Sequence, residues 1–153
     1  MTAQTIMNPN PVALRSTDTV GTATRYILTH RLRHLPVVDE EGRYLGIFGI
    51  FSLLQLTLPK AVTVDRGLEN VSFLSGGLPE LRDRLREQAD ELVINSLRQD
   101  VPVVSPETPL METVLLLLRT RMALPVVIQE TGRLVGTISS WEALNRIVGE
   151  EGI

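Results

Sequence analysis

The feature that most constrains this fold is an internal repeat. Leu35-Pro-Val-Val38 returns as Leu124-Pro-Val-Val127, 89 residues later, and Gly46 returns as Gly136, 90 residues later. A chain that repeats one pattern builds the same supersecondary unit twice. Neither unit, at about fifty residues, buries a sufficient core alone. The repeat therefore predicts two similar halves that pack into one module with pseudo-twofold symmetry.

Each copy shows the same order of local signals. In the first copy, Val20, Ala23 and Ile27 fall at helical spacing and precede the β-branched LPVV run. A polar turn ending in Gly-Arg then leads to a second strand, which reaches Gly46 or Gly136, and to a closing helix. The expected fold class is α/β (α+β), with two β-α-β-β-α repeats.

The first helix of each copy has polar or proline residues at its expected start. These are Thr17-Asp18 in the first copy and Ser105-Pro106-Glu107 in the second. In the second copy, the apolar residues Leu110, Met111 and Val114–Leu118 cover more than one face of the helix. Such a helix must be buried on both sides, so we expect its second side to contact another subunit.

The expected boundaries follow the repeat. Repeat 1 covers 1–56, a connecting segment covers 57–96, and repeat 2 covers 97–153. The first half of the connecting segment is mixed and loop-like. Its second half places apolar residues at helical spacing among charges, which predicts an amphipathic helix over about 79–96.

Composition limits the partners and the location of the protein. The net charge is −3 and the isoelectric point is near 5.4, which argues against nucleic acid as a partner. There is no cysteine, and the longest apolar block, Val114–Leu118, is far shorter than the roughly 20 residues of a membrane span. The first residues do not resemble a signal peptide. We expect a cytoplasmic protein without membrane insertion.

Motifs for catalysis are absent from the sequence. It contains no GxSxG elbow, no phosphate-binding P-loop and no HExxH zinc motif. The two histidines, His30 and His34, are separated by a predicted helix end and strand start, with Pro36 close by. We expect no catalytic residue, no metal site and no enzymatic activity.

The repeated motifs together resemble a known family. The start of each copy (MNPNPVALRSTDTV in the first), the H-L-P-V-V-D strand with its Gly-Arg turn, and the corner GTISSWEAL (Gly136–Leu144) resemble the cystathionine β-synthase (CBS) domain. A tandem pair of CBS domains forms a regulatory Bateman module. The resemblance covers nearly the whole chain apart from the connecting segment, and it implies a stand-alone module.

The resemblance carries expectations about ligands and partners. CBS pairs bind adenosine nucleotides in clefts between their two repeats and usually form homodimers through their helices. Most of them are fused to an enzyme, channel or transporter that they regulate. For this chain the resemblance implies AMP, ADP, ATP or S-adenosylmethionine as a regulatory ligand, and a separate enzyme or transporter as a partner.

The family pattern also implies ligand-binding residues at the closing corner. A strand-end hydroxyl lies near phosphate, and an Asp three residues later receives the ribose hydroxyls. Ser139 and Glu142 occupy these two positions, and Ser140 adds a second hydroxyl. Repeat 1 has Gly49 and Ser52 instead, so we expect a lopsided site in which repeat 2 holds the ribose.

Two further groups of residues follow from the same pattern. Backbone groups beside the two opening strands would bracket adenine; by position these are Val101, Pro102, Met122 and Ala123. Arg33 and His34, just before the LPVV strand of repeat 1, would face the phosphates.

Simpler interpretations remain open for the same residues. Ser139 and Ser140 could cap the helix near Trp141, with Glu142 as a first-turn acid. Arg33 and His34 could be ordinary solvated charges. Trp141 itself is expected in the core or an interface rather than stacked on adenine.

The sequence therefore supports two functions. The first is a regulatory, energy-sensing module whose adenosine nucleotide shifts a dimer or partner surface. The second is a degenerate CBS pair that acts as a ligand-free dimerisation or protein-docking module.

Overall fold

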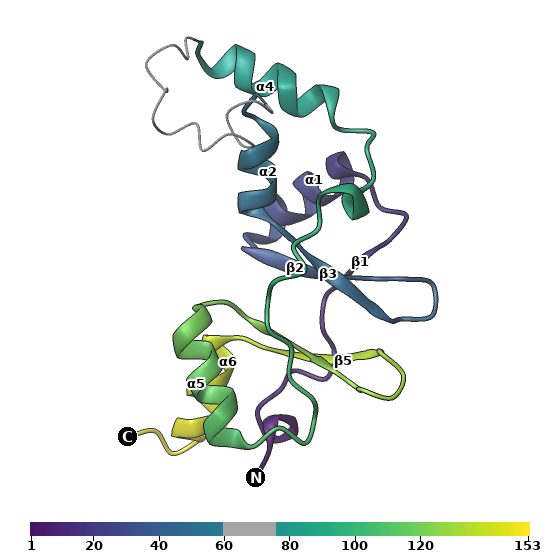
Figure 1. Cartoon of the computed structure of the whole chain (residues 1–153). Coiled ribbons are helices and arrows are strands. Elements are labelled where there is room, and N and C mark those ends of the chain that lie inside the picture. Colours follow the sequence, from purple (N-terminus) through teal and green to yellow (C-terminus); the bar gives the residue numbers. More distant parts are fainter. Residues whose placement is uncertain (60–75) are drawn as a thin grey trace. The chain divides into compact units, whose positions relative to one another are not determined.

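The computed structural model of the chain describes residues 1–59 and 76–153 (Figure 1). By residue contacts the chain divides into two compact units. Unit 1 comprises Met1–Arg15, Pro36–Ile47 and Arg98–Ile153, and unit 2 comprises Ser16–Leu35 and Phe48–Leu97. Unit 1 therefore combines segments of both repeats. The repeat boundaries expected from the sequence remain a prediction.

Helices and small sheets alternate along the chain, so the expected α+β class is confirmed. The strands are β1 (Leu14–Arg15), β2 (His34–Val38), β3 (Tyr44–Gly49), β4 (Leu124–Val127) and β5 (Leu134–Ile138). The helices are α1 (Val20–His30), α2 (Ile50–Leu56), α4 (Leu78–Glu87), α5 (Leu110–Thr120) and α6 (Ser140–Val148), with 3-10 turns η1 (Ala3–Thr5) and η3 (Val93–Ser96). Within the described residues, no helix has the length and hydrophobicity needed to cross a bilayer.

The two sheets contain the predicted LPVV strands. β1 lies parallel to β2, which neighbours β3, while β4 and β5 form an antiparallel pair. The first strand expected in repeat 2 is reduced to a single parallel bridge between Val104 and Val126. The two repeats therefore share the β-α-β-β-α order, although their first strands differ in length.

Helix α1 buries the predicted apolar stripe. Val20, Ala23 and Ile27 are each at most 1% exposed. The expected start at Thr17-Asp18 is wrong, because the N-cap is Thr19, whose hydroxyl oxygen accepts a hydrogen bond from the Thr22 amide at 3.2 Å. The Asp18 carbonyl instead accepts from the amide of Val93 in the connecting segment, at 3.0 Å.

Helix α5 also begins later than its sequence predicts. Ser105 and Thr108 form a closed turn, in which the Ser105 amide donates to the Thr108 hydroxyl at 2.9 Å. The helix follows Pro109 and begins at Leu110. The start signal at Ser105 therefore belongs to a separate turn.

The apolar residues of α5 divide between a buried and an exposed face. Thr113 and Leu117 are buried, whereas Met111 is 88% exposed and Leu118 is 68% exposed. The expectation of burial on both sides is therefore not met within one chain, which leaves an apolar face uncovered.

Helix α6 has an exposed apolar face as well. Its buried side includes Ala143, while Trp141 is 79% exposed and Leu144 and Ile147 are more than half exposed. Of the two locations expected for Trp141, the core is therefore wrong, and an interface remains a prediction. Ser139 is the N-cap between β5 and α6, so Trp141 falls on the first turn of the helix, outside its buried side.

The connecting segment forms a shorter helix than expected. α4 ends at Glu87, so the helix predicted over about 79–96 is wrong in its second half. The carbonyls of Ala89 and Glu91 accept hydrogen bonds from the first amides of α1, those of Gly21 and Val20, at 2.9 and 2.8 Å. These carbonyls therefore cap α1. The loop-like part of the connector, over 60–75, lies outside the described residues.

Unit 1 exchanges backbone hydrogen bonds between equivalent positions of the two repeats. The Tyr44 amide donates to the Gly132 carbonyl at 2.9 Å, and the Leu134 amide donates to the Gly42 carbonyl at 3.0 Å. Each donor and each acceptor of one repeat has its counterpart 90 residues away in the other. These two hydrogen bonds are related in the way that the predicted pseudo-twofold symmetry of the repeats requires.

The core of unit 1 gathers apolar residues from the N-terminal segment, the bridge residue before α5, and from α5, α6, β4 and β5. They are Ala3, Ile6, Val104, Leu117, Leu124, Val126, Ile138 and Ala143. This cluster fixes the N-terminal segment beside the closing corner of repeat 2, where the candidate site lies.

Candidate functional site

The closing corner of repeat 2 is a reciprocal helix cap. Ser139 has extended backbone angles between β5 and α6, and its hydroxyl oxygen accepts from the Glu142 amide at 3.1 Å. The Glu142 carboxylate accepts in return from the Ser139 amide at 3.3 Å. Such a capping box satisfies amides that a helix leaves without intrahelical partners. The capping interpretation is therefore confirmed for Ser139 and Glu142.

Capping leaves ligand-binding capacity at the same corner. The Ser139 hydroxyl acts as an acceptor in the cap, so its hydrogen remains available to a ligand. A carboxylate offers about four lone-pair positions, and the cap uses one of those on Glu142. Ser140 is exposed at the first position of α6. The corner can therefore cap the helix and accept a ligand at the same time.

A cavity of about 270 Å³ lies beside Glu142. It is lined by Ile6, Met7, Asn8, Pro9, Glu142 and Arg146. Small-molecule pockets commonly occupy about 300–1,000 Å³, so this cavity is slightly smaller than that range. It has room for part of a nucleotide, with one acidic and one basic side chain in its wall.

The N-terminal wall of this cavity is held by backbone pairing with β5. The Asn8 amide donates to the Thr137 carbonyl at 2.8 Å, and the Thr137 amide donates to the Asn8 carbonyl at 3.1 Å. A Cβ at Gly136 would come within 2.8 Å of both the Asn8 carbonyl oxygen and the Met7 sulfur. Glycine is required here because this segment packs directly on the strand.

The four residues expected to bracket adenine also belong to unit 1. Val101 is buried, while Pro102, Met122 and Ala123 are half-buried. The Met122 sulfur lies 3.7 Å from a guanidinium nitrogen of Arg98. None of the four lines the cavity beside Glu142. Their adenine-binding role remains a prediction.

The corresponding corner of repeat 1 is packed against its own backbone. Arg33 and His34 lie in unit 2, and a Cβ at Gly49 would come within 2.5 Å of the Arg33 carbonyl oxygen and 2.6 Å of the His34 Cβ. The Arg33 carbonyl accepts from the Ile50 amide at 2.8 Å, and the Gly49 amide donates to the buried Ser52 hydroxyl at 3.1 Å. This corner has neither a carboxylate nor space beside its strand end.

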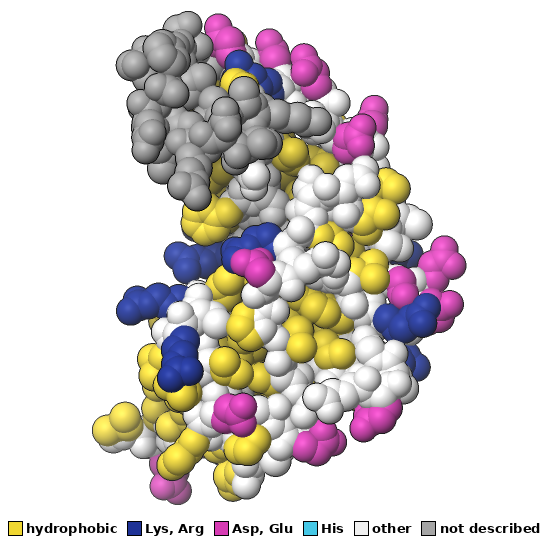
Figure 2. All heavy atoms as spheres, in the orientation of Figure 1, with side chains coloured by type: hydrophobic (Ala, Val, Ile, Leu, Met, Phe, Trp, Pro, Cys, Tyr) yellow, Lys and Arg dark blue, Asp and Glu magenta, His cyan; other side chains and the backbone are white. Residues whose placement is uncertain are grey.

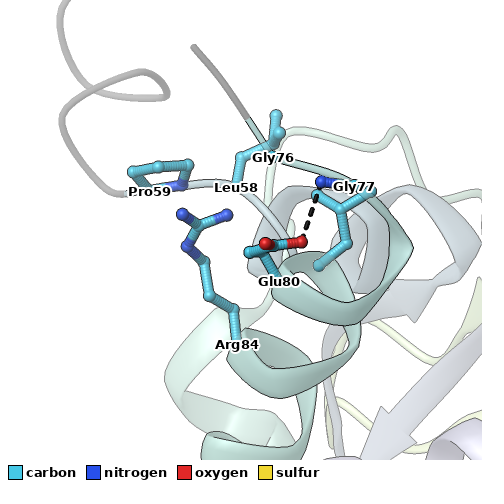
Figure 3. Close-up of a pocket in the computed structure, with 7 residues that line it drawn as sticks. Leu58, Pro59, Gly76, Gly77, Glu80 and Arg84 are labelled. Carbon is cyan, nitrogen blue, oxygen red and sulfur yellow. Dashed lines mark hydrogen bonds between the residues drawn. The ribbon is translucent and has the colours of Figure 1, made fainter.

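A second cavity lies at the start of α4 (Figure 3). Its volume of about 90 Å³ holds roughly three waters. Glu80 accepts from the Gly77 amide at 2.8 Å, and this bond lowers the pKa of Glu80 below its ordinary value. Arg84 donates to the Thr57 carbonyl at 3.3 Å. The charged groups are committed to backbone partners, and the space is too small for a nucleotide.

Tyr44 is the other unusual polar group of unit 1. Among the described residues its buried hydroxyl has no hydrogen-bond partner. Burial, with a smaller contribution from the negative charge of Asp100, raises the pKa of Tyr44 to about 12. The phenol is therefore neutral at physiological pH.

Metal ligands do not converge in the described part of the chain. No group of three or more His, Asp or Glu side chains is positioned to hold a metal ion there. His30 ends α1 and His34 begins β2, so the two histidines lie on different elements.

Sequence reasoning missed the N-terminal wall and the basic residue of the cavity. Met7–Pro9 belongs to repeat 1, but Asn8 pairs with Thr137 on β5 of repeat 2. Only the tertiary structure reveals this pairing. Arg146 follows Glu142 by four residues, a spacing that places two side chains on one helix face. That spacing could have identified Arg146 as a neighbour of Glu142.

Comparison with known proteins identifies the fold. The family model for the CBS domain matches residues 3–58 and 91–149. CBSX2 from Arabidopsis thaliana, a CBS-pair protein, has a similar structure, with 21% identity, a TM-score of 0.72, and coverage of 94% of this chain and 91% of that chain. No curated protein sequence matches the chain significantly.

Two similar structures contain adenosine compounds. CBSX2 in complex with AMP is 23% identical, with a TM-score of 0.67, and covers 94% of this chain and 93% of its own. The CBS domain pair of protein MJ0100, in complex with 5-methylthioadenosine and S-adenosyl-L-methionine, is 18% identical, with a TM-score of 0.61, and covers 97% and 100%. At these identities the likeness establishes the fold, and the two family matches establish that this chain belongs to the CBS domain family as a tandem pair.

Proposed function

We propose that this chain is a regulatory, non-catalytic CBS pair that binds an adenosine nucleotide. The observation that carries the proposal is the cavity beside Glu142, the acidic residue at the family's ribose position. Relatives of the same fold are known with AMP and with 5-methylthioadenosine and S-adenosyl-L-methionine. The candidate ligands are AMP, ADP, ATP and S-adenosylmethionine.

Glu142 has the central role in the proposed complex. A ribose diol has two hydroxyl donors, and the free lone pairs of the carboxylate accept them. Hydrogen bonds to a charged group contribute roughly 1.5–3 kcal/mol each. Ser139, with its hydroxyl hydrogen unused by the cap, and Ser140 add donors at the N-terminus of α6, which favours anions.

The remaining predicted residues complete the proposal. Val101, Pro102, Met122 and Ala123 bracket the adenine through backbone groups. The phosphate role of Arg33 and His34 stays a prediction, because both residues belong to unit 2 while Glu142 belongs to unit 1. The ligand regulates a separate enzyme or transporter in the cytoplasm. It can do so only by binding one state of the module more tightly than another.

Calorimetric titration of the four candidate ligands tests this function. The informative variant is Glu142→Gln, because a glutamine side chain preserves the capping box while it removes the carboxylate charge. We expect the wild type to bind at least one of the four ligands. We expect Glu142→Gln to bind it about tenfold or more weakly, at an unchanged unfolding temperature.

Glu112→Gln is the matched control. Glu112 is also a first-turn acid, on the sister helix α5, and it lies outside the cavity. Its binding should equal that of the wild type. Absence of heat with all four ligands, or equal affinity in Glu142→Gln and the wild type, contradicts the proposal.

The exposed apolar faces of α5 and α6 favour a second function, homodimerisation. Met111, Leu118 and Trp141 are 88, 68 and 79% exposed, and Figure 2 shows hydrophobic side chains at the surface in the region of these helices. Large apolar patches on a small protein mark interaction sites. A second copy of the chain, pairing helix to helix, is the proposed partner, with or without a nucleotide.

Light scattering coupled to size exclusion measures this second function. The wild type should have the mass of a dimer, and Leu118→Glu should shift it toward the monomer, because a charge would be buried without a partner. Gln129→Glu, in the exposed β4–β5 turn, is the control and should remain dimeric. A monomeric wild type at high micromolar concentration would exclude this function.

A further inference from the structure

We infer that Arg146 is a further ligand-binding residue, which neutralises an anionic group of the ligand in the cavity beside Glu142. The inference rests on the proposed function and deepens it. It specifies the charge of the nucleotide, and it adds a residue that the family pattern does not supply.

The position of the cavity on α6 is the first argument. Glu142 and Arg146 both line it, while Ser139 and Ser140 do not. The open space therefore extends from Glu142 along the helix toward Arg146, away from the N-cap. A ligand that fills it meets the guanidinium before it meets the serine hydroxyls.

The state of the Arg146 side chain is the second argument. Among the described residues, Arg146 forms no ion pair or side-chain hydrogen bond, even with Glu142 on the same wall. Arg43 and Arg98, in contrast, are both paired with nearby acids, at 2.9 and 3.1 Å. None of the five N–H donors of the Arg146 guanidinium is therefore used by another described side chain.

The spacing of the two side chains fits one class of ligand. Residues four apart on a helix lie on the same face, about 5–6 Å apart at their Cβ atoms, so Glu142 and Arg146 can contact two groups of one ligand. With the diol on Glu142, a 5′-phosphate can reach Arg146, whose planar fork suits a phosphate. The geometry favours a nucleoside monophosphate over a neutral nucleoside.

An ordinary helix-end role is the alternative for Arg146. A basic residue in the last turn of a helix stabilises it by a few tenths of a kilocalorie per mole, whatever ligand is present. This role predicts equal effects of substitution on charged and neutral ligands. The two interpretations therefore separate by ligand charge.

The experiment compares AMP with adenosine, which has the same base and ribose but no phosphate. Titrations of Arg146→Gln should show AMP binding weakened about tenfold and adenosine binding unchanged. Arg146→Lys, which keeps the charge but loses the fork, should be intermediate for AMP. Arg119→Gln, on α5 and outside the cavity, should bind both ligands as the wild type does.

Each other outcome overturns the inference in a distinguishable way. Equal loss for AMP and adenosine in Arg146→Gln would assign Arg146 a structural role, and unchanged AMP affinity would remove it from the site. A wild type that binds adenosine as tightly as AMP would reject the anionic ligand while the nucleoside site stands. A wild type that binds none of the candidate ligands would reject the proposed function itself, and this inference with it.

Discussion

The two closing corners of the chain share one layout but differ in what surrounds them. In repeat 1, Gly49 leads into α2 with the backbone of Arg33 and His34 pressed against it. In repeat 2, Ser139 leads into α6 with a capping box and a cavity beside Glu142. Duplication preserved the strand-to-helix turn in both places. Of the two turns, only that of repeat 2 has a carboxylate with a cavity beside it.

This difference explains why repeat 1 has a glycine, Gly49, at its strand end. From the sequence, Gly49 looks like a site residue that has lost its hydroxyl. In the structure, its φ of −160° is extended backbone that any residue adopts, so the requirement for glycine is steric. The lopsided site expected from the sequence therefore has a packing cause in repeat 1, and restoring one hydroxyl would not restore a site.

The largest predicted effect comes from copying the serine of repeat 2 into repeat 1. Gly49→Ser should lower the free energy of unfolding by about 3 kcal/mol, because its Cβ would overlap backbone that cannot move away alone. Urea unfolding of the variant and the wild type measures this difference. A loss below about half a kilocalorie per mole would show that the Arg33–His34 segment yields easily.

A smaller effect is expected for the reverse exchange in repeat 2. Ser139→Gly should cost only a few tenths of a kilocalorie per mole, while Ser139→Ala should cost about 1 kcal/mol, because alanine is the poorer N-cap. The same unfolding measurement applies to both variants. If alanine proved as stable as serine, the capping bonds at this corner would contribute nothing net.

Tyr44 and Leu134 occupy equivalent positions of the two repeats, and only Tyr44 can titrate. The dependence of stability on pH therefore tests the environment of this position in repeat 1. Folding raises the pKa of Tyr44 from 10.0 to about 12, so the fold favours the neutral phenol. Its contribution to stability is complete below about pH 10 and is lost as the pH rises toward about pH 12. Tyr44→Phe should abolish this alkaline loss, in urea titrations over that range.

The same variant also removes a buried hydroxyl that has no partner among the described residues. We therefore expect Tyr44→Phe to be more stable at neutral pH, by up to about 1 kcal/mol. Tyr26→Phe, on α1, is the control for the loss of one phenol. An alkaline loss of stability that persists in Tyr44→Phe would assign it to another group.

Local features of this fold could be predicted from the sequence because they depend on neighbouring residues. The LPVV strands, the buried stripe of α1 and the strand-to-helix corners all follow from periodicity and turn chemistry. Predictions of helix ends were less accurate. The carbonyls of Ala89 and Glu91 bond to α1 instead of continuing a helix, and distant partners of that kind leave no local pattern.

The same distinction between local and distant contacts applies to the candidate site. By itself the sequence determined the duplication and the family, because both follow from repeated motifs, and it placed Ser139 and Glu142 at one corner, because they are three residues apart. Only the tertiary structure decided that Met7–Pro9 forms a wall of the cavity and that Gly49 is packed shut. Both depend on backbone segments far apart in the chain that meet at close range, and packing of that kind is set by the whole fold.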